Sequence, residues 1–530
     1  MIAKYINPFR LKLWLCSLMA GLSLVACTDL SEEVFSEVTE DSFIPADSDV
    51  IALMASAYTP LRYVMGWQGY FDLQEEPADV IVTPTRPNGW DDGGIYKRMH
   101  WHKWTSTDWQ PRNTWITCFN GINNINRVIL QITSGEYPVD EGQIKYITAE
   151  MRALRALYYS ILIDTHGNVP IISDYGEDLP EQSTRQKVYE FIEAELTEVI
   201  PLLTNVVDNT TYGRMTRYAA WHVLARLYLN AEVYTGTPQW NKCIAACDEI
   251  INDGKFSLSD SYSAIFNTNN EENPEMVFAI PYDRIYAPEW SAHMKMLLPD
   301  HRDVFNMEAQ PWGGSSANPQ FIDSYDPKDN RLKDTWLMGD QLNASDGSVV
   351  MTLVKEMPSI YDCKFTEGFR CGKYEIEEGA TGSLSNDFPL LRYTDVLMMK
   401  AESLLRTGDS NTAAQLVTEV RRRSFDDPAD AGVTGAELEG DTNMAYGTLA
   451  EDGSIDEPGD QSPVVYGRFL DELGWEFACE ARRRTDLIRF GVYQTKNWYD
   501  HTPQGSHTAL FPIGYEEMNT NPNLKQNPGY

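Results

Sequence analysis

The sequence lacks the short motifs that identify most enzyme families. It contains no G-x-S-x-G, H-E-x-x-H, P-loop or G-x-G-x-x-G pattern. Its many carboxylates do not follow the β/α alternation of a glycosidase barrel, although counting alone does not exclude a catalytic pair. We therefore expect no catalytic residues, and a surface glycosidase is the least favoured alternative.

Cysteine and histidine are also sparse, with eight residues of each in the chain. No C-x-x-C pair or zinc-like Cys/His spacing occurs, and His100 and His102 stand without a third ligand beside them. We therefore expect no metal and no cofactor. Cys363 and Cys371 flank a short segment and could close a local disulfide after export.

Positive charge is in short supply. The chain has 43 Lys and Arg against 78 Asp and Glu, which gives a formal net charge of -35. A field of this sign repels nucleic acid and other polyanions. We therefore expect a neutral ligand and no nucleic-acid partner.

The apolar run near the N-terminus is too short for a transmembrane helix, but it has the form of a secretory signal. Three cations precede it, and we expect a signal peptide at residues 1–26. The junction Leu24-Val25-Ala26-Cys27 matches a bacterial lipobox, in which the cysteine is acylated and becomes the mature N-terminus. We expect lipidation of Cys27, which would give a stable membrane anchor. An ordinary signal-peptidase site is the alternative.

Helical periodicity dominates much of the remaining sequence, and the helices occur in pairs. Apolar residues recur at i, i+3, i+4 and i+7. The predicted helices span residues 149–163, 187–203, 215–233, 240–251, 390–405, 411–423 and 469–490. Residues 221–251 resemble a tetratricopeptide unit, and such units stack into a right-handed superhelix. The sequence therefore predicts a mainly α fold.

The periodicity fails between about residues 255 and 388, where short apolar runs alternate with Gly, Pro, Asn and Asp. Within this stretch, residues 275–281 indicate a short strand. The segment 426–463 is acidic, rich in Gly and poor in large apolar residues. We expect it to be a surface loop or a partly disordered insertion.

Several segments in order, behind the lipobox, resemble the RagB/SusD family. They are residues 149–159 with the turn 167–170, then 273–278, 387–402, 482–491 and 521–530. The most specific of them reads DFPLLRYTDVLMMKAE. The chain departs from the family at Ala481, where relatives often carry Gly, and in the length of the acidic segment 426–463.

The resemblance implies a tetratricopeptide-like scaffold with a loop-rich half that carries the ligand face. It implies a SusD-like N-terminal helical region at residues 27–260 and a RagB/SusD C-terminal region at residues 261–530. Family members are anchored by lipid to the outer membrane, cover a SusC-type TonB-dependent transporter and bind oligosaccharides or, in a few cases, peptides. We therefore expect a cell-surface lipoprotein that delivers a neutral oligosaccharide or polysaccharide to such a transporter. A peptide-binding transporter lid is the alternative.

Sugar recognition needs flat apolar faces and planar hydrogen-bonding groups. The loop at residues 80–96 supplies Arg86, Asn88, Trp90 and Asp91, and by resemblance it lies at the ligand face. We predict that these four residues bind the glycan. The alternative is that Trp90 anchors the loop in the core, because most tryptophans are largely buried.

The loop-rich half is predicted to supply a second wall. Tyr286 and Trp290 flank a proline, and Trp312 precedes two glycines that leave its ring little covered. We predict that all three contact the glycan. Trp67 and Trp336 are weaker candidates, for which core packing is the better interpretation. Core positions are also expected for Trp101, Trp104, Trp109 and Trp115.

Overall fold

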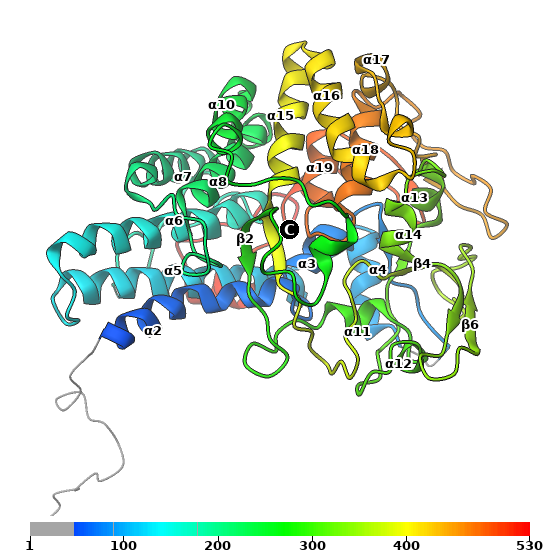
Figure 1. Ribbon diagram of the computed structural model, residues 1–530, viewed down its shortest axis with the longest axis horizontal. Coiled ribbons are helices and arrows are strands. Elements are labelled where there is room, and N and C mark those ends of the chain that lie inside the picture. The colour runs from blue at the N-terminus through cyan, green and yellow to red at the C-terminus, as the bar shows by residue number, and fades with distance from the viewer. Residues whose placement is uncertain (1–46, 88–89, 177–178) are drawn as a thin grey trace, which may run out of the picture. The chain divides into compact units, whose positions relative to one another are not determined.

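The computed structural model describes residues 47–87, 90–176 and 179–530. Residues 47–530 form one compact unit (Figure 1). The predicted signal peptide, the lipobox and Cys27 lie outside the described residues. Among the residues that are described, no helix combines the length and apolarity needed to cross a membrane.

A row of helices, each packed on the one before, forms the scaffold. The row consists of α5 (Trp109–Thr133), α6 (Glu141–Thr165), α7 (Arg185–Val199), α8 (Arg217–Leu229), α10 (Trp240–Ile251), α15 (Tyr393–Thr407) and α16 (Ser410–Arg421), and it can be followed in Figure 1. Shorter elements accompany it: α2 (Asp47–Tyr58), η2 (Thr59–Met65), α3 (Tyr70–Glu75), η4 (Ile200–Leu202), α9 (Ala231–Thr235) and η6 (Arg422–Ser424). This arrangement confirms the predicted mainly α, tetratricopeptide-like fold.

Local features of the sequence explain where these helices begin and how closely they approach. Thr184 and Thr216 cap α7 and α8 by accepting a hydrogen bond from a backbone N–H of the first turn. Gly121 lets α5 approach α6, because a Cβ there would lie 2.2 Å from the ring of Tyr158. The Tyr158 hydroxyl donates to the carbonyl of Ala57 at 2.8 Å, so α2 joins the same contact.

The segment between α10 and α15 consists of short elements, as the loss of periodicity predicted. They are η5 (Ser263–Phe266), β2 (Met276–Ile280), α11 (Ala292–Met296), α12 (His301–Val304), β3 (Ser316–Ala317), α13 (Pro319–Ser324), α14 (Arg331–Thr335), β4 (Trp336–Leu337), β5 (Gly339–Leu342), β6 (Val349–Leu353), β7 (Arg370–Cys371) and β8 (Phe388–Arg392). The strand predicted at residues 275–281 is β2, and it pairs antiparallel with β8.

The loop predicted to bind ligand lies beside this loop-rich segment. Its strand β1 (Ile81–Val82) pairs antiparallel with β3, with Val82 opposite Ser316. The loop continues through η3 (Asp92–Gly94) into α4 (Ile95–His100). The short sheet therefore brings together two segments that lie more than 200 residues apart in the sequence.

The segment 426–463 is more ordered than predicted. It contains η7 (Pro428–Ala431), α17 (Gly435–Leu438) and β9 (Gly447–Thr448), and β9 pairs in parallel with β10 (Trp498–Tyr499). Leu438 is fully buried and joins the core cluster between α15 and α16. A few apolar anchors therefore hold a segment whose composition suggested disorder. The chain ends with η8 (Ser506–Ala509) and α20 (Tyr515–Thr520).

The single helix predicted at residues 469–490 is wrong, because the structure has two helices there. They are α18 (Gly467–Phe477) and α19 (Arg483–Arg489). Between them, Cys479 and Ala481 have φ values of 61° and 57°, in the left-handed region that residues with a Cβ rarely adopt. The amphipathic pattern is continuous across this break, so periodicity alone did not reveal it.

The conformation of Ala481 leads to a testable prediction. Replacing Ala481 by Gly relieves the left-handed strain, so we expect the free energy of unfolding to rise by up to about 1 kcal/mol. Ala478 is the matched control, because its φ of -50° suits alanine and Ala478→Gly should lower stability. Urea unfolding of both variants measures the difference. Equal destabilisation by both substitutions would contradict the argument.

The disulfide suggested for Cys363 and Cys371 is absent. All six described cysteines are buried and unpaired. The Sγ of Cys363 instead accepts a hydrogen bond from the guanidinium of Arg86 at 3.0 Å. The short spacing in the sequence was therefore a poor guide, because the two thiols face different neighbours.

The tryptophans expected in the core divide into two groups. Trp104, Trp115 and Trp336 are buried, which confirms the prediction for them. Trp109 is 52% exposed, with its ring against the guanidinium of Arg112, and Trp101 is half-buried. The core interpretation is therefore wrong for Trp109.

Candidate functional site

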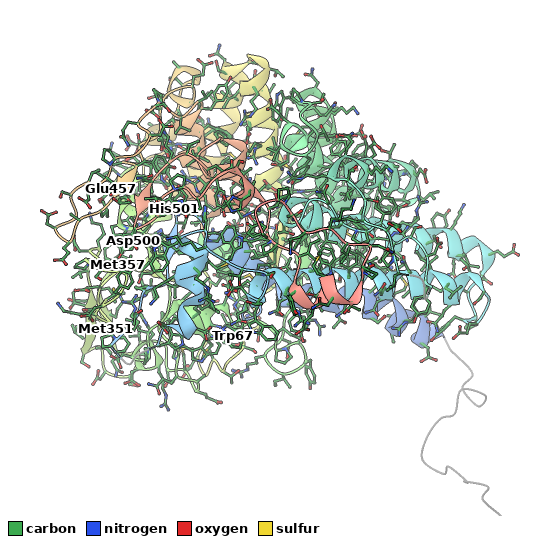
Figure 2. The ribbon with its side chains drawn as sticks, turned by 180° about the vertical axis from the view of Figure 1, so that it is seen from behind. Trp67, Met351, Met357, Glu457, Asp500 and His501 are labelled. Atoms are coloured by element: carbon green, nitrogen blue, oxygen red, sulfur yellow. The ribbon has the colours of Figure 1, made fainter. Side chains whose placement is uncertain are left out.

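Trp67 and Trp312 form an aromatic pair at the surface. Their ring centroids lie 6.3 Å apart and their planes meet at 69°. Trp67 is 52% exposed and Trp312 is half-buried. Figure 2 labels Trp67, which lies beside the green loop-rich segment. The core interpretation of Trp67 is therefore wrong, and the ring of Trp312, which was predicted to be little covered, is only partly exposed.

A groove opens beside Trp67, between η2 and the first half of α5. Its volume is about 560 Å³. Tyr63, which is 55% exposed, and Trp67 contribute aromatic rings to its wall. Three amide side chains also line it, those of Asn113, Asn120 and Asn124. Aromatic faces beside amide groups are the combination that sugar rings and their hydroxyl groups need.

Trp90, in the loop at residues 80–96, is partly exposed. Its ring stacks on Tyr96 with centroids 5.8 Å apart and planes at 21°. It also lies against Gly314, because a Cβ at that position would come within 2.7 Å of the Trp90 ring. The ring is therefore held in place by its neighbours but retains an exposed part.

The remaining polar residues predicted in this loop have different environments. Asp91 forms an ion pair with the ammonium of Lys97 at 3.1 Å, and its side chain is 37% exposed. Its carboxylate is therefore within reach of a ligand. Asn88 lies outside the described residues.

Arg86 is buried, which corrects the prediction that it binds ligand. Its exposed fraction is 1%. Its guanidinium donates to the carbonyl groups of Lys364 at 2.6 Å and Gly314 at 3.3 Å. It also donates to the hydroxyl of Ser316. Arg86 therefore ties the predicted binding loop to the loop-rich segment and leaves no donor pointing to the surface.

Trp290 is also buried, which corrects the second ligand prediction. Its exposed fraction is 0%. Its ring meets the edges of Tyr282, Tyr374 and Phe388 at centroid distances of 5.2, 4.8 and 6.0 Å. Trp290 is therefore part of an aromatic core and does not form a wall of the site.

Tyr286, from the same turn, is 84% exposed and remains available to a ligand. The carboxylate of Asp283 holds this turn, because it accepts from the backbone N–H groups of Ile285 and Tyr286, both at 2.8 Å. The Tyr282 hydroxyl donates to the carbonyl of Arg62 at 2.6 Å, which fixes the start of the turn against η2.

A buried ion-pair cluster supports the loop that carries Trp312. Lys295 is paired with Asp72 and with Glu76, and the backbone carbonyl of Lys295 accepts from the N–H groups of Gly314 at 2.8 Å and Ser315 at 3.1 Å. Burial raises the pKa of Asp72 to about 6, although the ammonium of Lys295 opposes the shift. The loop that carries Trp312 is thus fixed before any ligand arrives, which lowers the entropy cost of binding.

His100 and His102 do not resemble metal ligands. Both are buried, and burial lowers the pKa of each to about 3. One ring nitrogen of His102 lies 2.7 Å from the carbonyl of Pro77. Within residues 47–530, excluding the short gaps, no group of three or more His, Cys, Asp or Glu side chains could hold a metal ion.

Comparison with known proteins finds matches over most of the chain. Residues 254–530 match the model of the SusD family, and residues 32–229 match a family model described as starch-binding and associating with the outer membrane. The starch-binding protein SusD of Bacteroides thetaiotaomicron is 25% identical over 481 residues, which are 80% of each chain.

Solved structures show the same fold. Surface glycan-binding protein A of Bacteroides uniformis superimposes with a TM-score of 0.67 at 20% identity, covering 91% of this chain and 99% of its own. A laminarin-binding SusD-like protein superimposes with a TM-score of 0.68 at 20% identity, covering 92% of this chain and all of its own. The resemblance noted in the sequence is thereby confirmed, and the chain belongs to the SusD family, whose members associate with the outer membrane.

Proposed function

We propose that the protein is a cell-surface lipoprotein that captures a neutral oligosaccharide or polysaccharide and delivers it to a SusC-type TonB-dependent transporter. The observation that carries the proposal is the Trp67–Trp312 pair, in which the exposed ring of Trp67 lines an amide-bearing groove. The starch-binding and laminarin-binding relatives support this ligand class. The net charge of -35 favours a neutral ligand over an anionic one.

The residues have separate roles in this proposal. The rings of Trp67 and Trp312 stack on the C–H faces of sugar rings, and Trp90 and Tyr286 extend the aromatic surface. Asp91 and the amides of the groove bind hydroxyl groups. Asn88 keeps its predicted role as a further ligand contact. The protein acts by binding and has no catalytic role.

Delivery requires a partner and an anchor, and both belong to the proposal. The matched family model describes association with the outer membrane, which supports attachment through an acylated Cys27. Residues 27–260 form the SusD-like helical region in this view, and residues 261–530 form the C-terminal region. Co-purification of a TonB-dependent transporter from membranes in mild detergent tests the partner.

Calorimetric titration against neutral polysaccharides, including starch and laminarin, tests the ligand. Binding without release of reducing ends supports the proposal. Release of reducing ends would instead identify a glycosidase. Binding of peptides with no response to any glycan would favour the peptide-binding alternative.

The anchor leads to a separate prediction. Replacing Cys27 by Ala removes the only sulfur at the predicted cleavage site, so acyl chains cannot be attached. We expect the variant to leave the membrane fraction, whereas a Cys16→Ala control, within the predicted signal peptide, should remain bound. Cell fractionation with palmitate labelling measures both. Continued labelling of the Cys27→Ala variant would contradict the lipobox.

A further inference from the structure

A second aromatic surface lies apart from the Trp67–Trp312 pair. Trp101, at the end of α4, and Tyr361, in the loop after β6, have ring centroids 5.8 Å apart with planes at 38°. Tyr361 is 63% exposed and Trp101 is half-buried. Two tilted rings therefore meet at the surface, and one of them has most of its area in solvent.

Polar side chains surround this pair and fix its geometry. The indole N–H of Trp101 donates to the carboxylate of exposed Asp500 at 2.7 Å. The ammonium of exposed Lys103 lies 5.7 Å from the Trp101 ring centroid. A carboxylate and an ammonium beside an aromatic face can hydrogen-bond the hydroxyl groups of a sugar stacked on that face.

The surface rests on a firm support. Val82, Met357, Ile360, Cys363 and Tyr499 form a small buried cluster, against which Trp101 packs. Figure 2 shows Trp67 well apart from both Met357 and Asp500. The two aromatic surfaces are therefore distinct, and removing one should leave the other intact.

The backbone nevertheless connects the second surface to Trp90, which extends the aromatic surface of Trp67 and Trp312. Thr85 pairs with the loop of Tyr361, because its N–H donates to Ile360 at 2.9 Å and its carbonyl accepts from Cys363 at 3.1 Å. The next residue, Arg86, donates its backbone N–H to the carbonyl of Trp90 at 3.2 Å. Hydrogen-bonded backbone segments lie about 5 Å apart, so two such pairings in succession place the backbone beside Tyr361 roughly 10 Å from that of Trp90. A glycan of a few sugar residues can span this distance.

A lysine lies between the two surfaces. The ammonium of Lys97 donates to Asp91 at 3.1 Å on the side of the first surface. On the other side it lies 5.8 Å from the ring centroid of Tyr361. Lys97 is largely buried and also donates to the hydroxyl of Thr85, so it holds Asp91 and the Tyr361 ring in fixed positions and does not itself face a ligand.

We propose that Trp101, Tyr361, Asp500 and Lys103 form a second sugar-binding surface, which binds another stretch of the polysaccharide chain held at Trp67 and Trp312. This inference rests on the proposed glycan-binding function. It predicts that the protein binds long chains more tightly than short ones, because a chain held at two surfaces gains affinity from both.

The test compares Tyr361→Ala with the wild-type protein on a long polysaccharide and on a short oligosaccharide of the same glycan. We expect the affinity for the long chain to fall roughly tenfold and the affinity for the short one to stay within about twofold. Trp67→Ala should weaken the binding of both. The fold should be unaffected, because Tyr361 is largely exposed.

Tyr146→Ala is the matched control. Tyr146 is 51% exposed on α6, and the ammonium of Lys145 lies 4.7 Å from its ring centroid. The Tyr146→Ala variant therefore loses a similarly exposed ring beside a lysine. It should bind both ligands like the wild type. Wild-type affinity of Tyr361→Ala for the long chain, or an equal loss for both lengths, would overturn the second surface alone. A wild-type protein that binds no glycan would overturn the proposed function and this inference with it.

Discussion

Replacing Glu476 by Ala is expected to destabilise the protein by about 3 to 5 kcal/mol, because it removes a buried carboxylate that pairs with three arginines and balances part of their charge. Glu476 is fully buried on α18. Its carboxylate accepts from Arg423 at 2.7 Å, Arg392 at 2.9 Å and Arg331 at 3.1 Å. Although burial opposes the shift, these three guanidinium groups hold the pKa of Glu476 well below its usual range.

Two further variants sharpen this prediction. Glu476→Gln keeps the shape but removes the charge, so its defect should be full at neutral pH. The folded-state pKa of Glu476 lies below the ordinary value of 4.5. The stability that the Glu476 charge contributes is therefore lost as the pH falls below 4.5, and the difference in the free energy of unfolding between the wild type and Glu476→Gln should narrow there. Glu457→Ala is the control, because Glu457 lies in an exposed loop (Figure 2) and should change stability by less than about 0.5 kcal/mol. Urea unfolding measures all three, and a Glu476→Ala defect no larger than that of the control would refute a stabilising network.

Further buried ion pairs explain why the segments 387–402 and 482–491 are so distinctive in the sequence. Arg392 and Asp395 of the first are buried, and Asp395 pairs with Arg482 of the second. Arg489 pairs with Glu402 at 2.7 Å. Charged residues on an amphipathic helical pattern usually face solvent, whereas these are paired inside the protein.

The scaffold was predictable because its helices depend on local signals. The helix expected at residues 240–251 is α10, with the same bounds. The break between α18 and α19 was not predictable in this way. It depends on Arg483 pairing with Asp79 and Arg484 pairing with Asp164, which are distant in the sequence. Periodicity carries no information about such partners.

The site was predicted only in part, for a similar reason. Arg and Trp are residue types that often contact sugars. In this protein, however, other residues of the loop-rich segment, such as Lys364 and Tyr374, pack on Arg86 and Trp290. Trp67 was underestimated although a signal was present. It stands between Gly66 and Gly69, and this is the same feature that indicated an exposed ring at Trp312.

The aromatic pair gives the second large effect. Replacing Trp67 by Ala is expected to lower the affinity for the glycan roughly tenfold or more, because ring stacking contributes about 1 to 3 kcal/mol and each 1.4 kcal/mol is about a decade. Trp312→Ala should have an effect of the same order, since the two rings form one surface. The thermal midpoint of Trp67→Ala should stay close to that of the wild type, because the ring is 52% exposed and its removal leaves no closed cavity.

Trp290→Ala is the matched control, because it removes the same side chain from a fully buried position. It should cost about 3 to 5 kcal/mol of stability, since it opens a cavity among Tyr282, Tyr374 and Phe388. Its folded fraction should bind the glycan normally. Affinity by titration and the thermal midpoint, measured on all three variants, separate a ligand contact from a core residue. If Trp67→Ala and Trp312→Ala bound the glycan with wild-type affinity, the ligand would have to bind elsewhere on the protein.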